Sequence, residues 1–151
     1  MNLNQKTYLL ITGASRGIGK ALAIQISSKL GNDSVIVLLA RSSEGLAETK
    51  SEIDSLNRAT LKVQTHSIDL CKATEKQFAA LLEDSLKLSG EGPESFQRGL
   101  IIHNVGSLGD VSKAAGEISN TSIWTNYYQL NVFSVISLNC EFMRVFDKVS
   151  K

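Results

Sequence analysis

The amino-acid sequence predicts an α/β protein in which helices cover both faces of a doubly wound parallel sheet. Apolar runs of strand length alternate with segments of helical spacing, and this strand–helix rhythm occurs four times. In addition, the candidate motifs directly follow the apolar runs. Because ligands of such sheets bind beyond the carboxyl ends of the strands, the turns after the runs are the candidate site.

The first strand, turn and helix form the strongest local pattern. The apolar run Tyr8–Ile11 leads into a glycine-rich turn, and a helical stripe of aliphatic residues follows it. The turn holds Gly13, Gly17 and Gly19, and the stripe holds Ile18, Leu22, Ile26 and Leu30. Glycines let the backbone turn sharply and let phosphate approach N–H groups, and a helix N-terminus adds unpaired donors and partial positive charge. The sequence therefore predicts a nucleotide-phosphate cradle here.

Two common glycine loops do not fit this turn. The phosphate loop of kinases and ATPases needs GxxxxGK followed by Ser or Thr, whereas five residues separate Gly13 from Gly19, and Lys20 is followed by Ala21. The dinucleotide pattern GxGxxG is not matched literally either; the spacing is TGxxxGIG.

The next elements continue the alternation. Gly31–Asp33 is expected to end the first helix. The β-branched run Ser34–Ala40 predicts a strand buried on both faces, and the polar segment Ser42–Arg58, with a thin stripe of Leu46, Ile53 and Leu56, predicts an exposed helix. Leu61–Ser67 alternates apolar and polar residues and predicts a third strand.

The second half of the chain adds two helices and one strand. Thr74 and Gln77 have capping-box spacing, and an amphipathic stripe follows them. Leu100–Asn104 predicts a fourth strand, which we expect at an edge of the sheet. A long helix is predicted from about Ser122 to about Lys148. Because it is apolar on more than one face, we expect the domain to bury one side and a partner to bury another.

Composition limits the class of protein. The 151 residues fit one domain, 1–151, with 42% hydrophobic and 21% charged residues. A net charge of +1 does not suggest nucleic-acid binding. Cys71 and Cys140 have no metal-ligand spacing and suggest reduced thiols, and no metal site is predicted. With neither a signal peptide nor a membrane-spanning run, we expect a soluble, cytoplasmic chain without membrane contacts.

The residues at the strand ends suggest the cofactor. Arg41 follows the second strand, where a carboxylate would select NAD and an arginine favours the 2′-phosphate of NADP. Arg16 in the glycine turn can reach the same phosphate. Asp69 after the third strand either accepts from the adenine amino group or caps the following helix. Asn131, in an apolar helical run, either joins helices or belongs to the active site. The two histidines, His66 and His103, are interpreted as structural residues with satisfied hydrogen bonds.

Taken together, TGASRGIG at Thr12–Gly19, Asp69-Leu70, Asn104-Val105-Gly106 and Asn131 resemble the short-chain dehydrogenase/reductase family, although HNVG stands where NNAG is usual. The resemblance covers about Tyr8 to Phe146. It implies a Rossmann-like sheet, truncated here after about four strands and the long fourth-crossover helix, that forms an incomplete NADP-binding domain. The implied cofactor-binding residues are Gly13, Ser15, Arg16, Gly17, Ile18, Gly19, Arg41, Asp69, Leu70, Asn104, Val105 and Gly106. The implied catalytic residue is Asn131, which supports a proton relay through water.

GSLGDVSK at Gly106–Lys113 and the segment Asn126–Asn131 resemble a branch of that family that reduces a side-chain carbonyl of a pterin with NADPH in tetrahydrobiopterin synthesis. The resemblance also implies a homodimer packed through the helix around 122–148. The family's Ser and TyrxxxLys catalytic set has no match: Tyr127 and Tyr128 are followed four residues later by Asn131 and Val132. We therefore expect a chain that is inactive alone. The alternative is a non-catalytic NADP-binding protein, or a short form that pairs with an intact reductase and poisons its dimer.

Overall fold

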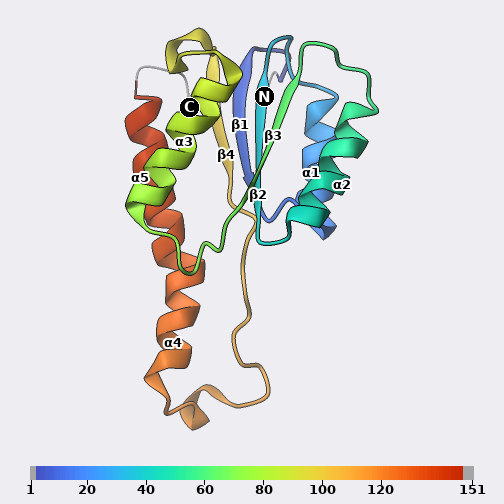
Figure 1. Cartoon of the computed structure of the whole chain (residues 1–151). Helices are drawn as coiled ribbons and strands as arrows, with labels where there is room; N and C mark the ends of the chain where they lie inside the picture. The colour runs from blue at the N-terminus through green and yellow to red at the C-terminus, as the bar shows by residue number, and fades with distance from the viewer. Residues whose placement is uncertain (1–2, 148–151) are drawn as a thin grey trace.

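The computed structural model describes residues 3–147 as four parallel strands with helices on both sides (Figure 1). The strand order is β3-β2-β1-β4. The strands are β1 (Thr7–Thr12), β2 (Val35–Ala40), β3 (Lys62–Ser67) and β4 (Arg98–Ile102). The α-helices are α1 (Gly17–Ser27), α2 (Ser43–Asp54), α3 (Glu75–Ser89), α4 (Thr121–Tyr128) and α5 (Ser134–Val145). The predicted doubly wound parallel sheet is confirmed, with β4 at one edge.

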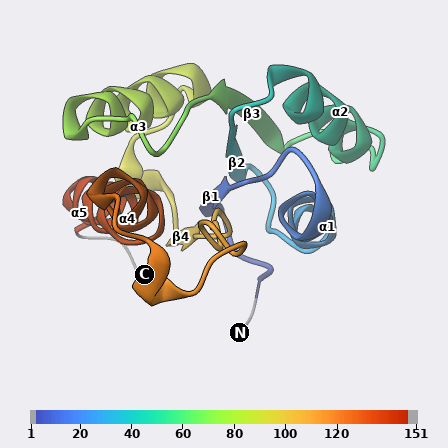
Figure 2. The ribbon, with the colours of Figure 1, turned by 90° about the horizontal axis from the view of Figure 1, so that it is seen from below.

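Each face of the sheet has its own core. Helices α1 and α2 lie on one face, and α3 and α5 lie on the other (Figure 2), whereas α4 lies beyond the carboxyl ends of the strands (Figure 1). Tyr8 and Leu10 of β1 face the cluster with α3 and α5, whereas Leu9 and Ile11 face the cluster with α1 and α2. Every residue of β1 and β2 is buried. Burial on both sides explains why these strands are continuous apolar runs rather than alternating ones.

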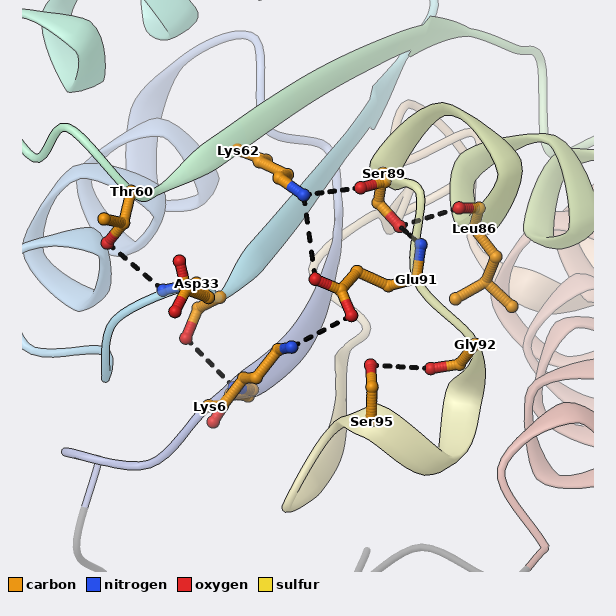
Figure 3. Close-up of polar contacts among 11 residues, drawn as sticks. Lys6, Asp33, Thr60, Lys62, Leu86, Ser89, Glu91, Gly92 and Ser95 are labelled. Carbon is orange, nitrogen blue, oxygen red and sulfur yellow. Dashed lines mark hydrogen bonds and ion pairs between the residues drawn. The ribbon is translucent and has the colours of Figure 1, made fainter.

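An ion cluster fastens the amino ends of the strands (Figure 3). The Glu91 carboxylate accepts a hydrogen bond from Lys6 Nζ at 2.9 Å and lies 3.7 Å from Lys62 Nζ. The hydrogen bond from Lys6, followed by one from Ser95, holds the pKa of Glu91 below its usual range. This cluster ties the start of β1 and β3 to the end of α3. It leaves the opposite end of the sheet for the candidate site.

At the carboxyl ends of the strands, the chain extends well beyond the sheet. The segment after β4 runs outward and returns through α4, which continues into α5 (Figure 1). A π-helical turn, Gln129–Phe133, joins the two helices. In this turn the Ser134 N–H bonds to the Gln129 carbonyl, which is one residue further back than in an α-helix. The predicted single long helix is therefore two helices around a π turn.

Several predicted boundaries are wrong. The fourth strand was expected at Leu100–Asn104, but β4 starts at Arg98, which pairs with Thr7, and ends at Ile102. Helix α1 ends at Ser27, well before the Gly31–Asp33 segment expected to cap it.

Two helix ends also differ from the prediction. Helix α2 ends at Asp54, so Leu56 and Arg58 lie outside it, and Arg58 instead donates to the carbonyls of Ser28 and Leu30. Helix α5 ends at Val145, and Lys148, the expected end, lies outside the described residues.

The predicted cap of α3 and the two free thiols are confirmed. Thr74 caps α3 in a capping box with Gln77. Cys71 and Cys140 are free thiols. Among residues 3–147, no helix combines the length and apolar character needed to cross a bilayer.

Candidate functional site

A cleft of about 1240 Å³ opens at the carboxyl ends of the strands. It is bordered by the glycine turn and by the segments after β2, β3 and β4. The first turns of α2 and one side of α4 complete the border. Eleven of the thirteen predicted site residues line it: Gly13, Ser15, Arg16, Gly17, Ile18, Arg41, Asp69, Leu70, Asn104, Val105 and Gly106. The two that do not are Gly19 and Asn131. The fold thus brings nearly all of the candidate residues to one place, and their roles stay predictions.

The three glycines serve two different geometric purposes. Gly13 and Gly17 have φ of +70° and +58°, in the left-handed region that favours glycine. Gly19 has ordinary helical geometry, but a Cβ there would lie 2.2 Å from the Gly13 carbonyl oxygen and 2.5 Å from Asn104 Nδ2. Gly19 therefore lets helix α1 pack closely against the turn. It does not line the cleft, and its predicted contact with a cofactor stays a prediction.

Neighbouring segments hold the backbone of the turn. The N–H groups of Gly13 and Ala14 donate to the Leu39 carbonyl at 2.7 and 3.1 Å. Asn104 Nδ2 donates to the Gly13 carbonyl at 3.3 Å. Thr12 Oγ1 in turn accepts from the N–H groups of Asn104 and Val105 at 2.9 and 3.2 Å. These bonds join the ends of β1, β2 and β4 into one rigid cradle.

Helix α1 begins at this cradle with its N-terminus open. Its N-cap residue, Arg16, has an extended backbone (φ −164°) and no side chain caps the helix. The first N–H groups of an α-helix have no partner within the helix. Gly17 and Ile18, the first two residues of α1, line the cleft, and Ile18 is 73% exposed. The geometry is that of an anion site, where amide donors and the helix dipole face an open space.

Arg16 and Arg41 border the same cleft from the turn and from the end of β2. Neither forms an ion pair with another residue in the described part of the chain. The cleft also carries the carboxylates of Glu44 and Glu48, both on α2. Because both signs of charge are present, recognition of an anion here depends on where the guanidinium groups lie and not on net charge.

Asp69 lies at the cleft but does not cap the following helix. Its Oδ1 accepts from the Cys71 N–H at 3.1 Å, and its carbonyl accepts from the N–H groups of Lys72 and Ala73. Thr74, five residues later, caps α3. The helix-cap interpretation of Asp69 is therefore wrong, and its predicted contact with adenine stays a prediction.

Asn131 sits in the π turn and binds the loop that follows β4. Its Oδ1 accepts from the Ser107 N–H at 2.9 Å, and its Nδ2 donates to the carbonyls of Ser107 and Tyr127, both at 3.0 Å. A Cβ on Gly106 would lie 3.4 Å from the same Oδ1. Asn131 thus joins a helix to a loop and not to another helix, and it holds residues that line the cleft. The alternative of helix–helix contact is not seen within residues 3–147, and the catalytic role of Asn131 stays a prediction.

The end of the cleft near α4 has a different character. Tyr127 lines it, and a Cβ on Gly109 would lie 3.1 Å from the Tyr127 ring. Asp110 also lines this end, and hydrogen bonds from the Ser112 hydroxyl and N–H hold the pKa of Asp110 below its usual range. This end therefore offers an aromatic ring and an ionised carboxylate.

The two histidines differ. His103 Nε2 bonds to Asn139 Oδ1 at 2.8 Å, as expected of a structural residue. His66 Nε2 is buried with no hydrogen-bond partner among the described residues, so the satisfied role predicted for His66 is wrong. Burial lowers its pKa, and the nearby Asp84 carboxylate opposes that shift.

Several residues that shape the site from behind were not predicted from the sequence. Thr12 appeared there as part of a motif, but its hydroxyl is what links the loop after β4 to β1. Gly45 and Thr49 of α2 contact the turn directly. The available signal was two small residues four positions apart on a helix that follows the second strand, since residues so spaced share one face.

Comparisons with known proteins agree with this geometry. The family model described as short chain dehydrogenase matches residues 7–151. Sepiapterin reductase of Rattus norvegicus is 38% identical over 138 residues, and that of Mus musculus is 36% identical. Each alignment covers 91% of this chain and 51% of the relative, so the chain spans about half the length of these curated relatives.

Solved structures point to the same family. A short-chain dehydrogenase of Shigella flexneri 2a str. 301, solved in complex with NADP, superimposes with a TM-score of 0.77 at 26% identity. The superposition covers 97% of this chain and 56% of that one. With the match of the family model to nearly the whole chain, these likenesses show that the protein belongs to the short-chain dehydrogenase family.

Proposed function

We propose that this chain binds NADP(H) in the cleft and represents the cofactor-binding part of a carbonyl reductase of the sepiapterin reductase type. The observation that carries the proposal is the convergence of Arg16 and Arg41 on a cleft that starts at the open N-terminus of α1. A guanidinium pair suits the 2′-phosphate, and helix amides suit the pyrophosphate. Sequence similarity to sepiapterin reductases supports the branch.

Different residues of the cleft would contact different parts of such a cofactor. The turn at Gly13–Ile18 would bind the pyrophosphate, Asp69 and Leu70 would contact adenine, and the Asn104–Gly106 loop would approach the nicotinamide half. When bound, NADPH supplies a hydride for reduction of a carbonyl group. The substrate that the similarity suggests is a pterin with a side-chain carbonyl.

We further propose that these 151 residues do not reduce a carbonyl alone. None of the tyrosines, Tyr8, Tyr127 and Tyr128, is followed four positions later by lysine. Asn131 would support proton transfer through water, but no tyrosine–lysine pair is present to deliver the proton. Turnover of NADPH with sepiapterin by the purified chain would contradict this part of the proposal.

Calorimetric titration of the purified chain with NADPH and NADH tests cofactor binding. We expect NADPH to bind more tightly than NADH. Arg16→Ala and Arg41→Ala should each weaken NADPH binding by about tenfold, because each removes a charge-assisted hydrogen bond. Both variants should leave NADH nearly unchanged. Lys87→Ala is the control, since it removes the same unit charge from an exposed site on α3. Equal affinity for both cofactors, or an equal effect of the control, would refute the assignment.

A homodimer through α4 and α5 is the proposed assembly. Large apolar side chains are exposed along these helices and the π turn between them: Tyr128, Val132, Phe133, Ile136 and Met143. Helical residues three, four or seven apart share a face, so a second copy can cover them together. We expect Ile136→Glu to shift the mass measured by light scattering from dimer to monomer. The control is Lys50→Glu on α2. A monomeric parent chain would refute the proposal.

The same helices favour a second candidate function, a non-catalytic chain that pairs with an intact reductase and poisons its dimer. The exposed apolar face combined with the missing tyrosine–lysine pair supports it. Co-expression with a full-length sepiapterin reductase tests it. Recovery of mixed dimers with reduced activity is the expected result, and recovery of pure homodimers would reject this candidate.

A further inference from the structure

We propose that Thr49 of α2 is a positioning residue that fixes the glycine turn relative to Arg41, so that both arginines can meet one phosphate. The inference rests on the proposed binding of NADP(H). Part of the cofactor selectivity then depends on the Thr49 hydroxyl, which does not line the cleft.

The hydroxyl of Thr49 connects the helix to the turn. Its Oγ1 lies 2.9 Å from the Ala14 carbonyl oxygen and 2.9 Å from the Gly45 carbonyl oxygen. Thr49 and Ala14 are both 0% exposed, so water cannot replace this donor without a rearrangement. Within a helix, threonine commonly bonds to the carbonyl four residues back. Here the same hydroxyl also reaches a backbone atom of the phosphate-binding turn.

Gly45 brings the helix close enough for that bond. A Cβ on Gly45 would lie 2.9 Å from the Ser15 carbonyl oxygen and 3.0 Å from Ser15 Cβ. Gly45 and Thr49 are four residues apart and therefore lie on one face of α2. Helix α2 thus rests on Ala14 and Ser15 at a distance that a larger side chain would not permit.

This contact links the two arginines through short, stiff segments. Arg16 directly follows Ser15, which lies so near Gly45 that a Cβ on Gly45 would clash with it. Arg41 precedes Ser42, whose hydroxyl caps α2 by accepting from the Gly45 N–H at 3.1 Å. The 2′-phosphate of NADPH can contact both arginines only if the distance between them is kept. NADH lacks this phosphate, so its binding depends on the turn alone. Loosening the contact should therefore weaken NADPH more than NADH.

The test compares three variants with the parent chain by calorimetric titration with NADPH and NADH. Thr49→Val keeps the shape and removes the donor, and it should weaken NADPH binding by about tenfold and NADH by less than about threefold. Thr49→Ser keeps a hydroxyl and should restore most of the affinity. Gly45→Ala keeps the hydroxyl but pushes α2 from the turn, so it should reproduce the effect of Thr49→Val.

Ser27→Ala serves as the control, because the buried Ser27 hydroxyl bonds to the Ala23 carbonyl within α1 and does not touch the turn. Amide hydrogen exchange without ligand supplies a second readout. Thr49→Val should speed exchange at Ser15–Gly17, and Ser27→Ala should not.

The outcomes separate this inference from the proposed function. If the parent chain binds neither cofactor, the proposed function fails, and unchanged exchange at Ser15–Gly17 in Thr49→Val overturns the inference as well. If the parent binds NADPH but Thr49→Val keeps the parent's NADPH-to-NADH ratio, the inference alone is overturned. An equal loss for both cofactors together with a lower melting temperature would indicate a structural role and also overturn it. Should Thr49→Val not fold, Thr49→Ala decides by the same ratio, because it also removes the donor and Thr49 does not line the cleft.

Discussion

Replacing Gly17 by alanine separates the binding role of the glycine turn from its role in folding. Gly17 has φ of +58°, and apart from its chain neighbours and the backbone of its own helical turn, no described atom lies within 4 Å of the position that a Cβ would take. Gly90, at the C-terminus of α3, has φ of +72° and equally open surroundings. The two glycines therefore present the same local problem to a side chain. They differ in place, since Gly17 lines the cleft and Gly90 does not.

The expected magnitudes follow from this pairing. A left-handed backbone at a residue with a Cβ costs about 1–2 kcal/mol, so both variants should lose that much stability. For a domain of this size the loss corresponds to a melting temperature lower by roughly 2–8 °C. At Gly17 the added methyl also occupies the space through which phosphate would approach the amides. Loss of one or two charge-assisted hydrogen bonds there should weaken NADPH binding by about 10- to 100-fold.

Thermal unfolding and calorimetric titration of both variants provide the assay. We expect similar melting temperatures for Gly17→Ala and Gly90→Ala, with NADPH affinity lost in Gly17→Ala alone. Binding by Gly17→Ala that matches Gly90→Ala would refute the phosphate-cradle assignment. A much lower melting temperature for Gly17→Ala would instead show that the open space around this residue is closed in solution.

Two other residues give predictions that do not depend on the cofactor. Because burial lowers the pKa of His66, the unfolded chain binds this proton more readily than the folded one, and stability should fall as pH drops below about 6.5. His66→Gln should flatten the fall of the melting temperature between pH 7.5 and 5.5, and parallel pH profiles for parent and variant would contradict this. Asn131→Ala removes both bonds to Ser107, so trypsin should cut faster at the exposed Lys113 in the loop beyond it. Asn131→Asp keeps the acceptor and should lie between, and equal cleavage rates in all three chains would count against the bond's role.

The fold and the turn were predictable because their signals are local. Strands β1 and β2 are buried on both faces, and such strands read as unbroken apolar runs. The left-handed geometry at Gly13 and Gly17 leaves glycine as the favoured residue, so the spacing of the turn is visible in the sequence. The capping box of α3 is likewise a short-range pattern.

The errors arise where partners far apart in sequence decide the local structure. Strand β4 starts at Arg98 because its backbone pairs with Thr7, although apolar residues begin later. It ends at Ile102, and beyond it the N–H groups of Asn104 and Val105 donate to Thr12 Oγ1 and not to a strand. Asn131 in the π turn bonds to Ser107, which is 24 residues away in the sequence, and periodicity cannot show such a contact. His66 is a half-buried residue of an edge strand, its Nε2 has no hydrogen-bond partner within residues 3–147, and the sequence contains no signal for that.

The same distinction explains why the binding site and its selectivity have different origins in the sequence. The phosphate-binding turn needs glycines at a fixed spacing. A sequence motif can therefore predict the turn. The orientation of the cradle depends on Thr49, Asn104 and Leu39, which reach the turn from α2, the loop after β4 and β2. Their contacts are single hydrogen bonds to backbone atoms, and such contacts produce no recognisable spacing of residues in the sequence. If Thr49→Val changes the preference for NADPH over NADH while the glycines are intact, residues outside the glycine motif help to set the cofactor selectivity of this fold.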